Sequence, residues 1–303
     1  MVDERESITA KLCAFARAWH SYYSREIIYD DYLAFDFMGK EEYEEMLEMI
    51  KEGLIDSERL EKENAEKVIA DYFLPIPLSR MHFNENGLAE FAKENGKIQY
   101  VICGAGADTF SFRNDNDDIE VFEVDHPDTQ RYKLERINEL EWILRENVHY
   151  VPVDFSKDRL VDKLLEAGFD PEKKTYFSIM GVSYYLTLEV FAETLRQIAE
   201  LSLVGSKVVF DYPLSSGHYP DRVKRLEEIT ESLGEVMCGG FDSNEMRCVL
   251  CSLGFKLDVQ MDPKQIQETY FEGRSDGLKA FENVSLVSAT YVNKRFEAER
   301  MAV

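Results

Sequence analysis

The chain has 303 residues, 45% of them hydrophobic, with 19 Phe and 16 Tyr, so it is long enough to bury a substantial core. It carries 35 Lys and Arg against 59 Asp and Glu, and the resulting formal net charge of −24 repels nucleic-acid phosphates and anionic membrane surfaces alike. We therefore expect an ordinary globular protein without a nucleic-acid partner.

The cysteines and the N-terminus point to a cytoplasmic protein. The cysteines at 13, 103, 238, 248 and 251 are odd in number and contain no paired C-x-x-C elements of the zinc-site type, so we expect reduced thiols and no metal. The opening MVDERESITAKLCAFARAWH is charged where a signal peptide needs an apolar run. No apolar stretch is long enough to span a bilayer, so no membrane partner is expected. The oligomeric state has no signal in the sequence.

The segment before Gly96 is predicted to be helical, because its apolar residues recur at helical spacing. Its runs extend from Ile8 to Trp19, from Lys40 to Glu52, and from an N-cap at Asp56 or Ser57 to the prolines Pro75 and Pro77, after which a further helix leads to Gly96. We expect residues 1–95 to form a helical cap and lid segment.

After Gly96 the pattern changes to short apolar runs separated by helical stretches. Seven of these runs are predicted to be strands: Ile98 to Cys103, Ile119 to Val124, His149 to Val153, Thr175 to Met180, Lys207 to Tyr212, Lys256 to Met261 and Ser285 to Val292. Apolar strands that alternate with helices are typical of a mostly parallel sheet covered on both faces. The last two strands can close the sheet as an antiparallel pair. The sequence predicts a doubly wound α/β fold with a Rossmann-like seven-stranded sheet in residues 96–303, in one compact unit with the cap.

The segment CGAGAD follows the first predicted strand, where doubly wound sheets bind their ligands. Gly104 and Gly106, on either side of Ala105, permit a tight turn and close approach of a ligand because neither has a Cβ. A nicotinamide fingerprint would have a third glycine at Thr109, and Asp108 would repel a pyrophosphate. The loop therefore favours a ligand whose near end is not phosphate, such as the amino acid portion of S-adenosylmethionine.

Acidic residues follow the next two predicted strands. Asp125, in VFEVDHP, is positioned to accept both hydroxyls of a ribose. Asp154 can accept an adenine amino group, and Phe155 can pack on the ring. Each Asp also has a simpler explanation, since Asp125 can cap a helix that begins at Pro127. The succession of these groups along one sheet edge nevertheless favours an adenosine ligand.

Several segments together resemble the leucine carboxyl methyltransferase family, particularly its bacterial branch of polyketide-type O-methyltransferases. They are QYVICGAGADTFSFR, FEVDHPDTQRYK, YVPVDF, TYFSIMGVSYYLT and GSKVVFDY, with ITAKLCAFARAW and IIYDDYLAFDFMG near the N-terminus and GGFDSNEMRCVLCSLGFKLD near the C-terminus. The resemblance covers nearly the whole chain. It implies a class I methyltransferase fold with S-adenosyl-L-methionine as the methyl donor.

The resemblance also implies roles for individual residues. Arg80, in LSRMHF, matches the arginine that holds the donor's carboxylate, a task suited to a planar bidentate cation. Gly104 matches the glycine under the methionyl part and Asp125 the ribose-binding acid, while Asp154 and Phe155 match the adenine-binding pair. The predicted donor site further includes Ala105, Gly106, His126 and Met180. Without the resemblance, Arg80 would be taken for a surface charge at a helix end.

Met180 departs from the family pattern, which usually has an acid before the glycine, here Gly181. That acid normally lies near the donor's methionyl end, so its absence predicts weaker binding there or a changed acceptor site. The soft thioether of Met180 can instead pack beside the sulfonium. A non-catalytic protein that binds an adenosyl ligand or a partner is therefore an alternative to the enzyme.

We expect the methyl acceptor to be a hydroxyl or carboxyl of a small molecule, and a protein or peptide C-terminus is the alternative. A carboxylate acceptor needs no general base, whereas a hydroxyl does. The candidate bases are Tyr184, Tyr185, Tyr212 and His218. One of the first two tyrosines is expected in the core, and His218 can equally be an exposed loop residue. The side chains of Arg17, Trp19, Tyr22 and Tyr23 in the helical cap either cover the acceptor site or pack against neighbouring helices.

Overall fold

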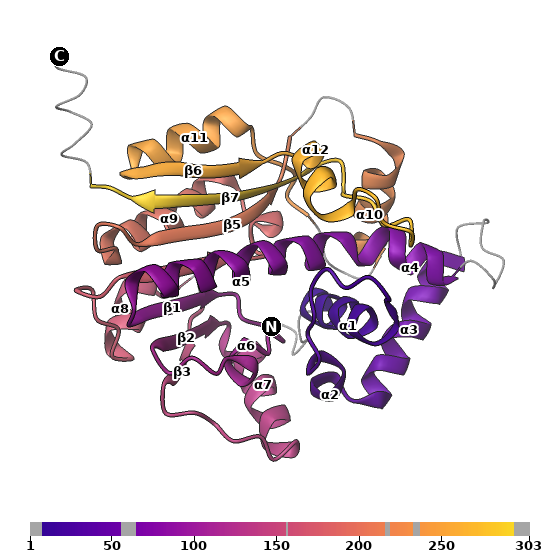
Figure 1. The fold of residues 1–303 in the computed structure, drawn as a ribbon, viewed down its shortest axis with the longest axis horizontal. Helices are drawn as coiled ribbons and strands as arrows, with labels where there is room; N and C mark the ends of the chain where they lie inside the picture. Colours follow the sequence, from indigo (N-terminus) through magenta and orange to yellow (C-terminus); the bar gives the residue numbers. More distant parts are fainter. Residues whose placement is uncertain (1–7, 56–64, 156, 216–218, 233–236, 294–303) are drawn as a thin grey trace.

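A seven-stranded sheet forms the centre of the computed structural model, which describes residues 8–55, 65–155, 157–215, 219–232 and 237–293 (Figure 1). The strand order is β3-β2-β1-β4-β5-β7-β6. The strands are β1 (Ile98–Cys103), β2 (Ile119–Asp125), β3 (Val148–Pro152), β4 (Thr175–Ile179), β5 (Lys207–Pro213), β6 (Phe255–Met261) and β7 (Val284–Tyr291). The strands β1 to β5 pair in parallel, whereas β7 is antiparallel to both β5 and β6.

All seven predicted strands are confirmed, each with both ends within about one residue of the prediction, a margin inside the usual uncertainty of element boundaries. The mostly parallel order and the final antiparallel pair are confirmed as well. The prediction succeeded because these strands are continuous apolar runs. Burial on both faces leaves little room for polar residues within them.

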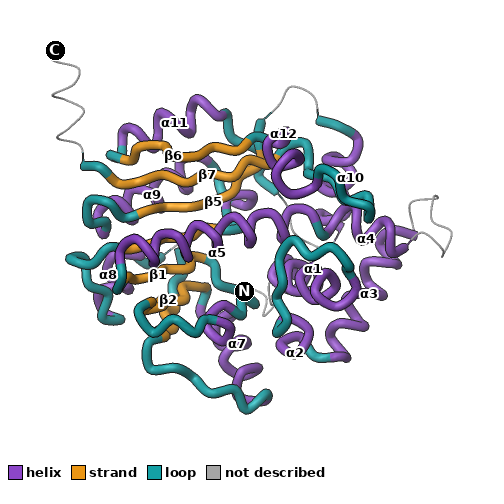
Figure 2. The backbone as a smooth tube through the Cα atoms, in the orientation of Figure 1, coloured by secondary structure: helices purple, strands orange, loops and turns teal. Residues whose placement is uncertain are grey.

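The helices surround the sheet in the arrangement of Figure 2. In chain order they are α1 (Ile8–Tyr23), α2 (Ala34–Met38), α3 (Lys40–Ile55), α4 (Ala65–Phe73), α5 (Pro75–Asn95), α6 (Phe110–Arg113), α7 (Pro127–Glu139), α8 (Leu160–Glu166), the 3-10 turn η2 (Ser183–Tyr185), α9 (Leu188–Leu201), α10 (Asp221–Ser232), α11 (Ser243–Ser252), α12 (Pro263–Ile266) and the π-helical η3 (Gln267–Phe271). Among the described helices, none is both long and apolar enough to cross a membrane.

Two of the predicted helices are confirmed within α1 and α3. The N-cap predicted at Asp56 or Ser57 lies outside the described residues. The helix that was predicted to end at the prolines ends at Phe73, and Pro75 is the first residue of α5. Proline suits that position because its fixed φ fits a helix and its missing N–H would have no intrahelical partner there.

Alternate strand residues face opposite helical layers. Tyr100 of β1 packs with Leu88 and Phe91 of α5 on one face. On the other face, Val101 belongs to a cluster that contains residues of α8, α9 and α11, including Phe191. Side chains of a strand point to opposite faces with a period of two, so each strand contributes to both layers. The same alternation determines which polar side chains of β4 and β5 point towards α5.

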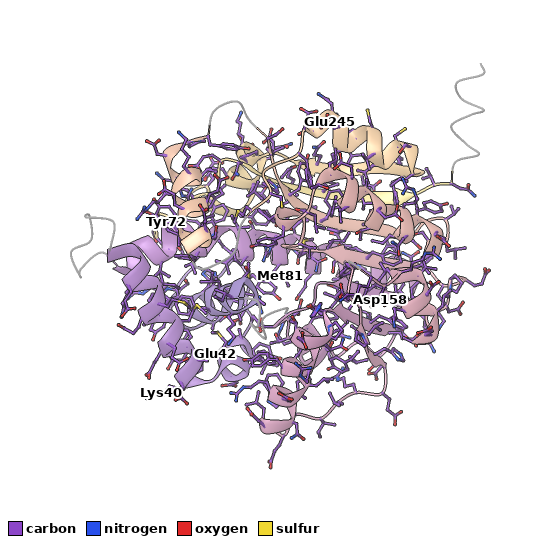
Figure 3. The ribbon with its side chains drawn as sticks, turned by 180° about the vertical axis from the view of Figure 1, so that it is seen from behind. Lys40, Glu42, Tyr72, Met81, Asp158 and Glu245 are labelled. Atoms are coloured by element: carbon purple, nitrogen blue, oxygen red, sulfur yellow. The ribbon has the colours of Figure 1, made fainter. Side chains whose placement is uncertain are left out.

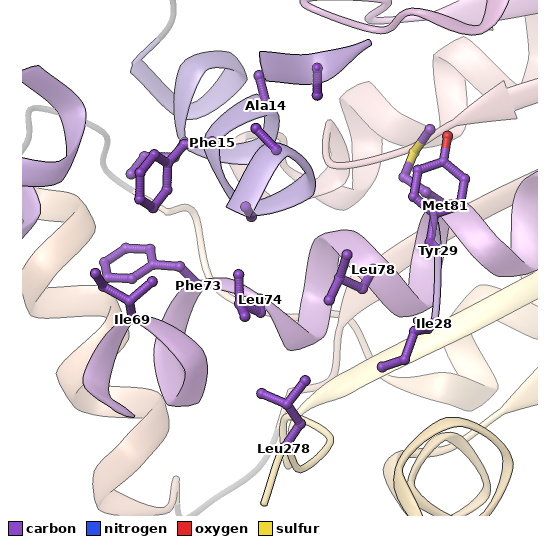
Figure 4. Close-up of a cluster of buried hydrophobic side chains, with 14 of the residues drawn as sticks. Ala14, Phe15, Ile28, Tyr29, Ile69, Phe73, Leu74, Leu78, Met81 and Leu278 are labelled. Atoms are coloured by element: carbon purple, nitrogen blue, oxygen red, sulfur yellow. The ribbon is translucent and has the colours of Figure 1, made fainter. Parts of the chain in front are cut away.

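The N-terminal helices share a hydrophobic cluster with the rest of the chain. Phe15 of α1, Phe73 of α4 and Leu78 of α5 belong to this cluster (Figure 4), which extends to Leu286 of β7. In the close-up, Ile69 and Phe73 of α4 lie opposite Phe15 of α1. Burial of these large side chains anchors α1 and α4 against α5, so the polar residues of α1 and α5 have fixed positions.

Candidate functional site

A cavity of about 530 Å³ opens at the carboxyl ends of β1 to β4. Ile102, Asp125, Val153 and Ser178 contribute to its wall from these four strands or the turns that follow them. Residues of α1 and α5 form the facing wall, among them Met81, which is labelled near the centre of Figure 3. This is the position at which doubly wound sheets bind ligands.

The glycine loop forms part of the wall of this cavity and is hydrogen-bonded to β2. The backbone N–H groups of Gly104 and Ala105 both donate to the carbonyl of Val124, at 2.8 and 3.1 Å. Gly104 has a φ of +79°, and a Cβ there would lie 2.5 Å from Cγ2 of Val182. A side chain at position 104 would therefore be strained and would clash. Asp108 also lines the cavity and accepts the N–H of Phe110 at 2.7 Å.

Asp125 lies beneath the same loop. Its carboxylate accepts the N–H of Gly106 at 2.5 Å and the N–H of His126 at 2.7 Å. Burial raises the pKa of Asp125, although the two N–H groups partly oppose the shift. The alternative that Asp125 caps the following helix is wrong, because the cap of α7 is His126, whose Nδ1 accepts the N–H of Asp128 at 3.3 Å.

The residues after β3 form the next part of the wall. Asp154 lines the cavity, and its carboxylate lies 2.5 Å from Nζ of Lys157 and 3.9 Å from Nε2 of His126. The ring of Phe155 is 38% exposed and also lines the cavity, so it offers an apolar face to a ligand. The structure thus brings Asp125, His126, Asp154 and Phe155 together, as the sequence predicts.

Arg80 lies on the opposite wall, in the second turn of α5. Its Nη1 lies 3.4 Å from Asp211 Oδ2 and its Nη2 lies 2.8 Å from Cys13 Sγ. Its buried Nε has no hydrogen-bond partner within the described residues. Gly181 has a φ of +74°, which favours glycine, and a Cβ there would lie 2.6 Å from Nη1, so a side chain at position 181 would displace the guanidinium. The interpretation of Arg80 as a surface charge at a helix end is wrong, since the side chain is 8% exposed.

Asp211 is a site residue that our sequence analysis missed. It is fully buried on β5 and accepts the N–H of Gly181 at 2.7 Å through Oδ1 and the hydroxyl of Tyr184 at 2.9 Å through Oδ2. Ser183 donates to its backbone carbonyl at 2.7 Å. Asp211 therefore holds the turn after β4 and is the counter-ion of Arg80. The signal was a carboxylate inside the apolar run KVVFDY, because a buried charge needs a partner.

The helix α1 contributes a row of residues to the cavity. Thr9, Ala10, Cys13 and Arg17 line it at helical spacing. Arg17 is buried, and its Nη2 donates to the carbonyl of Ala107 in the glycine loop at 2.7 Å. Its Nε pairs at 2.8 Å with the buried carboxylate of Asp31, in the loop after α1. The N-terminal helix and the glycine loop are thus joined by direct polar contacts.

The aromatic residues that accompany Arg17 lie elsewhere. The side chains of Tyr22 and Tyr23 are 70% and 58% exposed, and neither contributes to the cavity wall. Trp19 packs beside Phe15 with ring centroids 5.9 Å apart. Of the two roles that the sequence left open, packing therefore describes the three aromatic residues, whereas Arg17 lines the cavity.

The four candidate bases differ in their position relative to the cavity. Tyr185 lines the cavity, with its hydroxyl 3.1 Å from Thr9 Oγ1. Tyr184 is buried and donates to Asp211, and burial together with that carboxylate raises its pKa well above the ordinary value, so it stays protonated. Tyr212 faces the opposite side of the sheet, where its hydroxyl lies 2.7 Å from Gln260 Nε2, so its candidacy as a base is wrong. His218 lies outside the described residues.

Met180 follows β4 and lines the cavity, next to the Gly181 that packs on Arg80. The acid expected at this position is absent, but the buried carboxylate of Asp211 approaches Arg80 from β5. The cavity therefore contains cations on its helical wall and carboxylates on its loop wall. Together, the two walls can hold a ligand that has a carboxylate at one end and a diol and an amino group at the other.

Known proteins are similar to this chain over most of its length. A sequence model of the leucine carboxyl methyltransferase family matches residues 10–199. The protein YktD of Bacillus subtilis (strain 168), provisionally named an S-adenosyl-L-methionine-dependent methyltransferase, is 33% identical over 306 aligned residues, which cover 95% of this chain and 99% of YktD.

Two solved structures are similar in fold. A duf574 family protein from Streptomyces avermitilis superposes with a TM-score of 0.55 at 14% identity, over 91% of this chain and 96% of that chain. A protein from Thermobifida fusca, provisionally described as a methyltransferase, gives a TM-score of 0.52 at 15% identity, over 72% of this chain and 82% of that chain.

Proposed function

The chain belongs to the leucine carboxyl methyltransferase family, and we propose that it is an S-adenosylmethionine-dependent O-methyltransferase that acts on a hydroxyl or carboxyl of a small molecule. The observation that carries the proposal is the convergence of separate segments on one cavity. Arg80, Gly104, Asp125, Asp154 and Phe155 were each singled out from the sequence, and all of them line it.

The residues present fit the donor. The guanidinium of Arg80 is buried and retains an Nε donor that has no partner among the described residues, which suits a ligand carboxylate. The glycine loop has no Cβ at positions 104 and 106, so a methionyl chain can approach its backbone. Asp125 would accept the ribose hydroxyls, with Asp154 and Phe155 at the adenine. The neighbouring Ala105, Gly106, His126 and Met180 would complete the contact surface.

Positioning is the main task of the protein in this reaction. S-adenosylmethionine supplies an electrophilic methyl group that an oxygen nucleophile attacks in line. Arg80 would fix the donor's carboxylate and Asp125 its ribose, and such orientation can supply much of the rate acceleration. Residues of α1, including Thr9 and Cys13, line the same cavity, which supports a lid role for the N-terminal segment that excludes water. For a hydroxyl acceptor, Tyr185 is the candidate base in the described part of the cavity wall.

The loss of the family acid at Met180 does not leave Arg80 without a counter-ion, because Asp211 approaches it from β5. This contact keeps the guanidinium paired and supports an intact donor site, which both the catalytic proposal and the non-catalytic alternative require. Donor binding without turnover on any acceptor, followed by turnover in Met180→Glu, would instead favour the non-catalytic protein.

Calorimetric titration with S-adenosylmethionine, with NAD as the control, tests the donor. We expect a dissociation constant of about 1–100 μM for S-adenosylmethionine and no heat with NAD. Transfer of a labelled methyl group to small phenols, small acids and peptide carboxylates then separates the acceptor classes. Absence of S-adenosylmethionine binding by the folded protein, or labelling of peptides alone, would contradict the proposal.

A further inference from the structure

A second, smaller cavity adjoins the one described above. Its volume is about 70 Å³, and it lies among α1, α4, α5, η2 and α10. The residues that line both cavities are Thr9, Cys13, Arg80, Gly181 and Tyr185. Tyr72 of α4 lines the smaller cavity and Met81 of α5 the larger one, and both residues are labelled in Figure 3. The smaller cavity is therefore a side chamber of the candidate donor site.

The wall of the side chamber is mostly apolar. Beyond the shared residues and Thr230, its aliphatic and aromatic members are Leu12, Tyr72, Phe73, Ile76, Pro77, Tyr184, Leu226 and Met237. Within the described lining, Arg80 is the one charged residue, and it belongs to the shared wall. In a chain with 31% charged residues, a wall of this composition is suited to an uncharged group.

Two hydroxyl groups of this wall already have partners in the protein. The hydroxyl of Tyr184 donates to Asp211 at 2.9 Å, and Thr230 Oγ1 donates to the carbonyl of Leu226 at 3.1 Å. A ligand in the chamber therefore gains contact with apolar surface rather than new hydrogen bonds. Polar recognition of the acceptor would take place at the shared wall, where Tyr185 lies.

The volume limits what the chamber can take. A cavity of about 150 Å³ accommodates a benzene ring, and a water molecule occupies roughly 30 Å³ of the liquid. The chamber, at about 70 Å³, has room for a short aliphatic group but not for an aromatic ring without movement of its walls.

We propose that this side chamber receives a short, uncharged aliphatic group of the methyl acceptor, while the reacting oxygen of the acceptor lies beside Tyr185, on the larger-cavity side of the shared wall. The inference rests on the proposed function, because an acceptor requires a donor in the larger cavity. It narrows the acceptor to small molecules with a compact aliphatic end, such as a branched chain of three or four carbons.

Saturation-transfer NMR of the full chain, loaded with S-adenosylhomocysteine, tests the proposal. The probes are isobutanol and isobutyrate, with glycerol as the polar control. Ile76 lines the chamber and not the larger cavity, so Ile76→Trp fills the chamber from α5. Phe83 is on the same helix and lines neither of these two cavities, so Phe83→Trp is the matched control. Thr230→Leu fills the chamber from α10 if the first variant fails to fold.

We expect transfer to at least one branched probe and none to glycerol. The signal should fall about tenfold in Ile76→Trp or Thr230→Leu and persist in Phe83→Trp, with unchanged affinity for S-adenosylhomocysteine in all three. Equal signals in the filled and control variants, or no transfer to either branched probe, would overturn the assignment of the chamber. Failure of the wild type to bind S-adenosylhomocysteine would instead refute the proposed function itself.

Discussion

The two walls of the larger cavity are built in different ways. On the loop wall, contacts join residues close in the chain, as between Gly106 and Asp125, which are 19 positions apart. On the helical wall, Arg80 meets Asp211 across 131 positions and Arg17 meets Ala107 across 90. Local contacts leave motifs that can be read from neighbouring residues. Contacts that depend on helix packing leave no such motif. They nevertheless involve the buried charged residues on which we expect stability to depend most.

The largest effect is expected from Asp211→Ala, on the helical wall. The change leaves the buried Arg80 without its counter-ion and Tyr184 without an acceptor, so the free energy of unfolding should fall by about 3–5 kcal/mol. Urea denaturation measures this loss. The control is Glu200→Ala, which removes a half-exposed ion pair with Arg159 and should cost about 0–1 kcal/mol. A similar loss in the two variants would remove the contrast between buried and exposed pairs.

The next effect is expected from Asp31→Asn, where α1 joins the glycine loop. Asp31 is buried between Arg17 and Arg113 and accepts the hydroxyl of Thr109 at 2.5 Å. Loss of its charge should cost about 2–4 kcal/mol in urea denaturation at neutral pH. Burial alone would raise the pKa of Asp31, but the two arginines outweigh it and hold the pKa below its ordinary value.

Because the pKa of Asp31 is lowered, the stability difference between the wild type and Asp31→Asn should depend on pH in a defined direction. A carboxyl with a lowered pKa contributes stability at pH values above its unfolded pKa, and the contribution disappears as the pH falls through the folded pKa. The difference between wild type and Asp31→Asn should therefore narrow below about pH 4. A difference that stays constant or widens on acidification would contradict the ion pairing with Arg17 and Arg113.

On the loop wall, Asp125→Asn should act on ligand binding more than on stability. Burial raises the pKa of Asp125, and the ionised form is the better acceptor for ribose hydroxyls. Wild-type affinity for S-adenosylhomocysteine should fall as the pH is lowered towards the raised pKa of Asp125, whereas the variant should bind roughly tenfold more weakly with a flatter profile. Parallel profiles for the two proteins would show that another group governs the titration.

The smallest effect is expected from Met180→Glu. Arg80 already faces Asp211, so a second carboxylate should change the affinity for S-adenosylhomocysteine by less than about tenfold, or 1.4 kcal/mol. Met180→Leu controls for the loss of the thioether. A gain of several hundredfold in Met180→Glu would mean that the site of the natural chain lacks a working acid and that Asp211 does not compensate for it.

The same difference between the walls explains how far the sequence could predict the structure. Strands such as Ile98–Cys103 were predictable because buried parallel strands are continuous apolar runs. The positions of Gly104 and Asp125 followed from the loop after the first strand and the end of the second. These features depend on backbone geometry within a few residues.

The errors concern side chains whose partners are distant in the chain. The burial of Arg80 and the role of Asp211 depend on how α5 packs over β5, which the periodicity of either segment leaves open. Tyr212 was misplaced although it adjoins Asp211, because neighbouring residues of a strand face opposite sides of the sheet. The side chamber arises only where several helices meet, so no single segment could reveal it.

Calorimetric titration of two adenosyl thioethers tests most directly whether one donor bridges the two walls. S-adenosylhomocysteine has the amino acid portion, and 5′-methylthioadenosine lacks it. We predict that Arg80→Lys weakens the binding of S-adenosylhomocysteine by at least about tenfold and leaves the binding of 5′-methylthioadenosine unchanged, because lysine keeps the charge but loses the bidentate fork. Asp125→Ala should weaken both ligands. Equal weakening of both ligands in Arg80→Lys, or unchanged binding in Asp125→Ala, would contradict a donor held between Arg80 and Asp125.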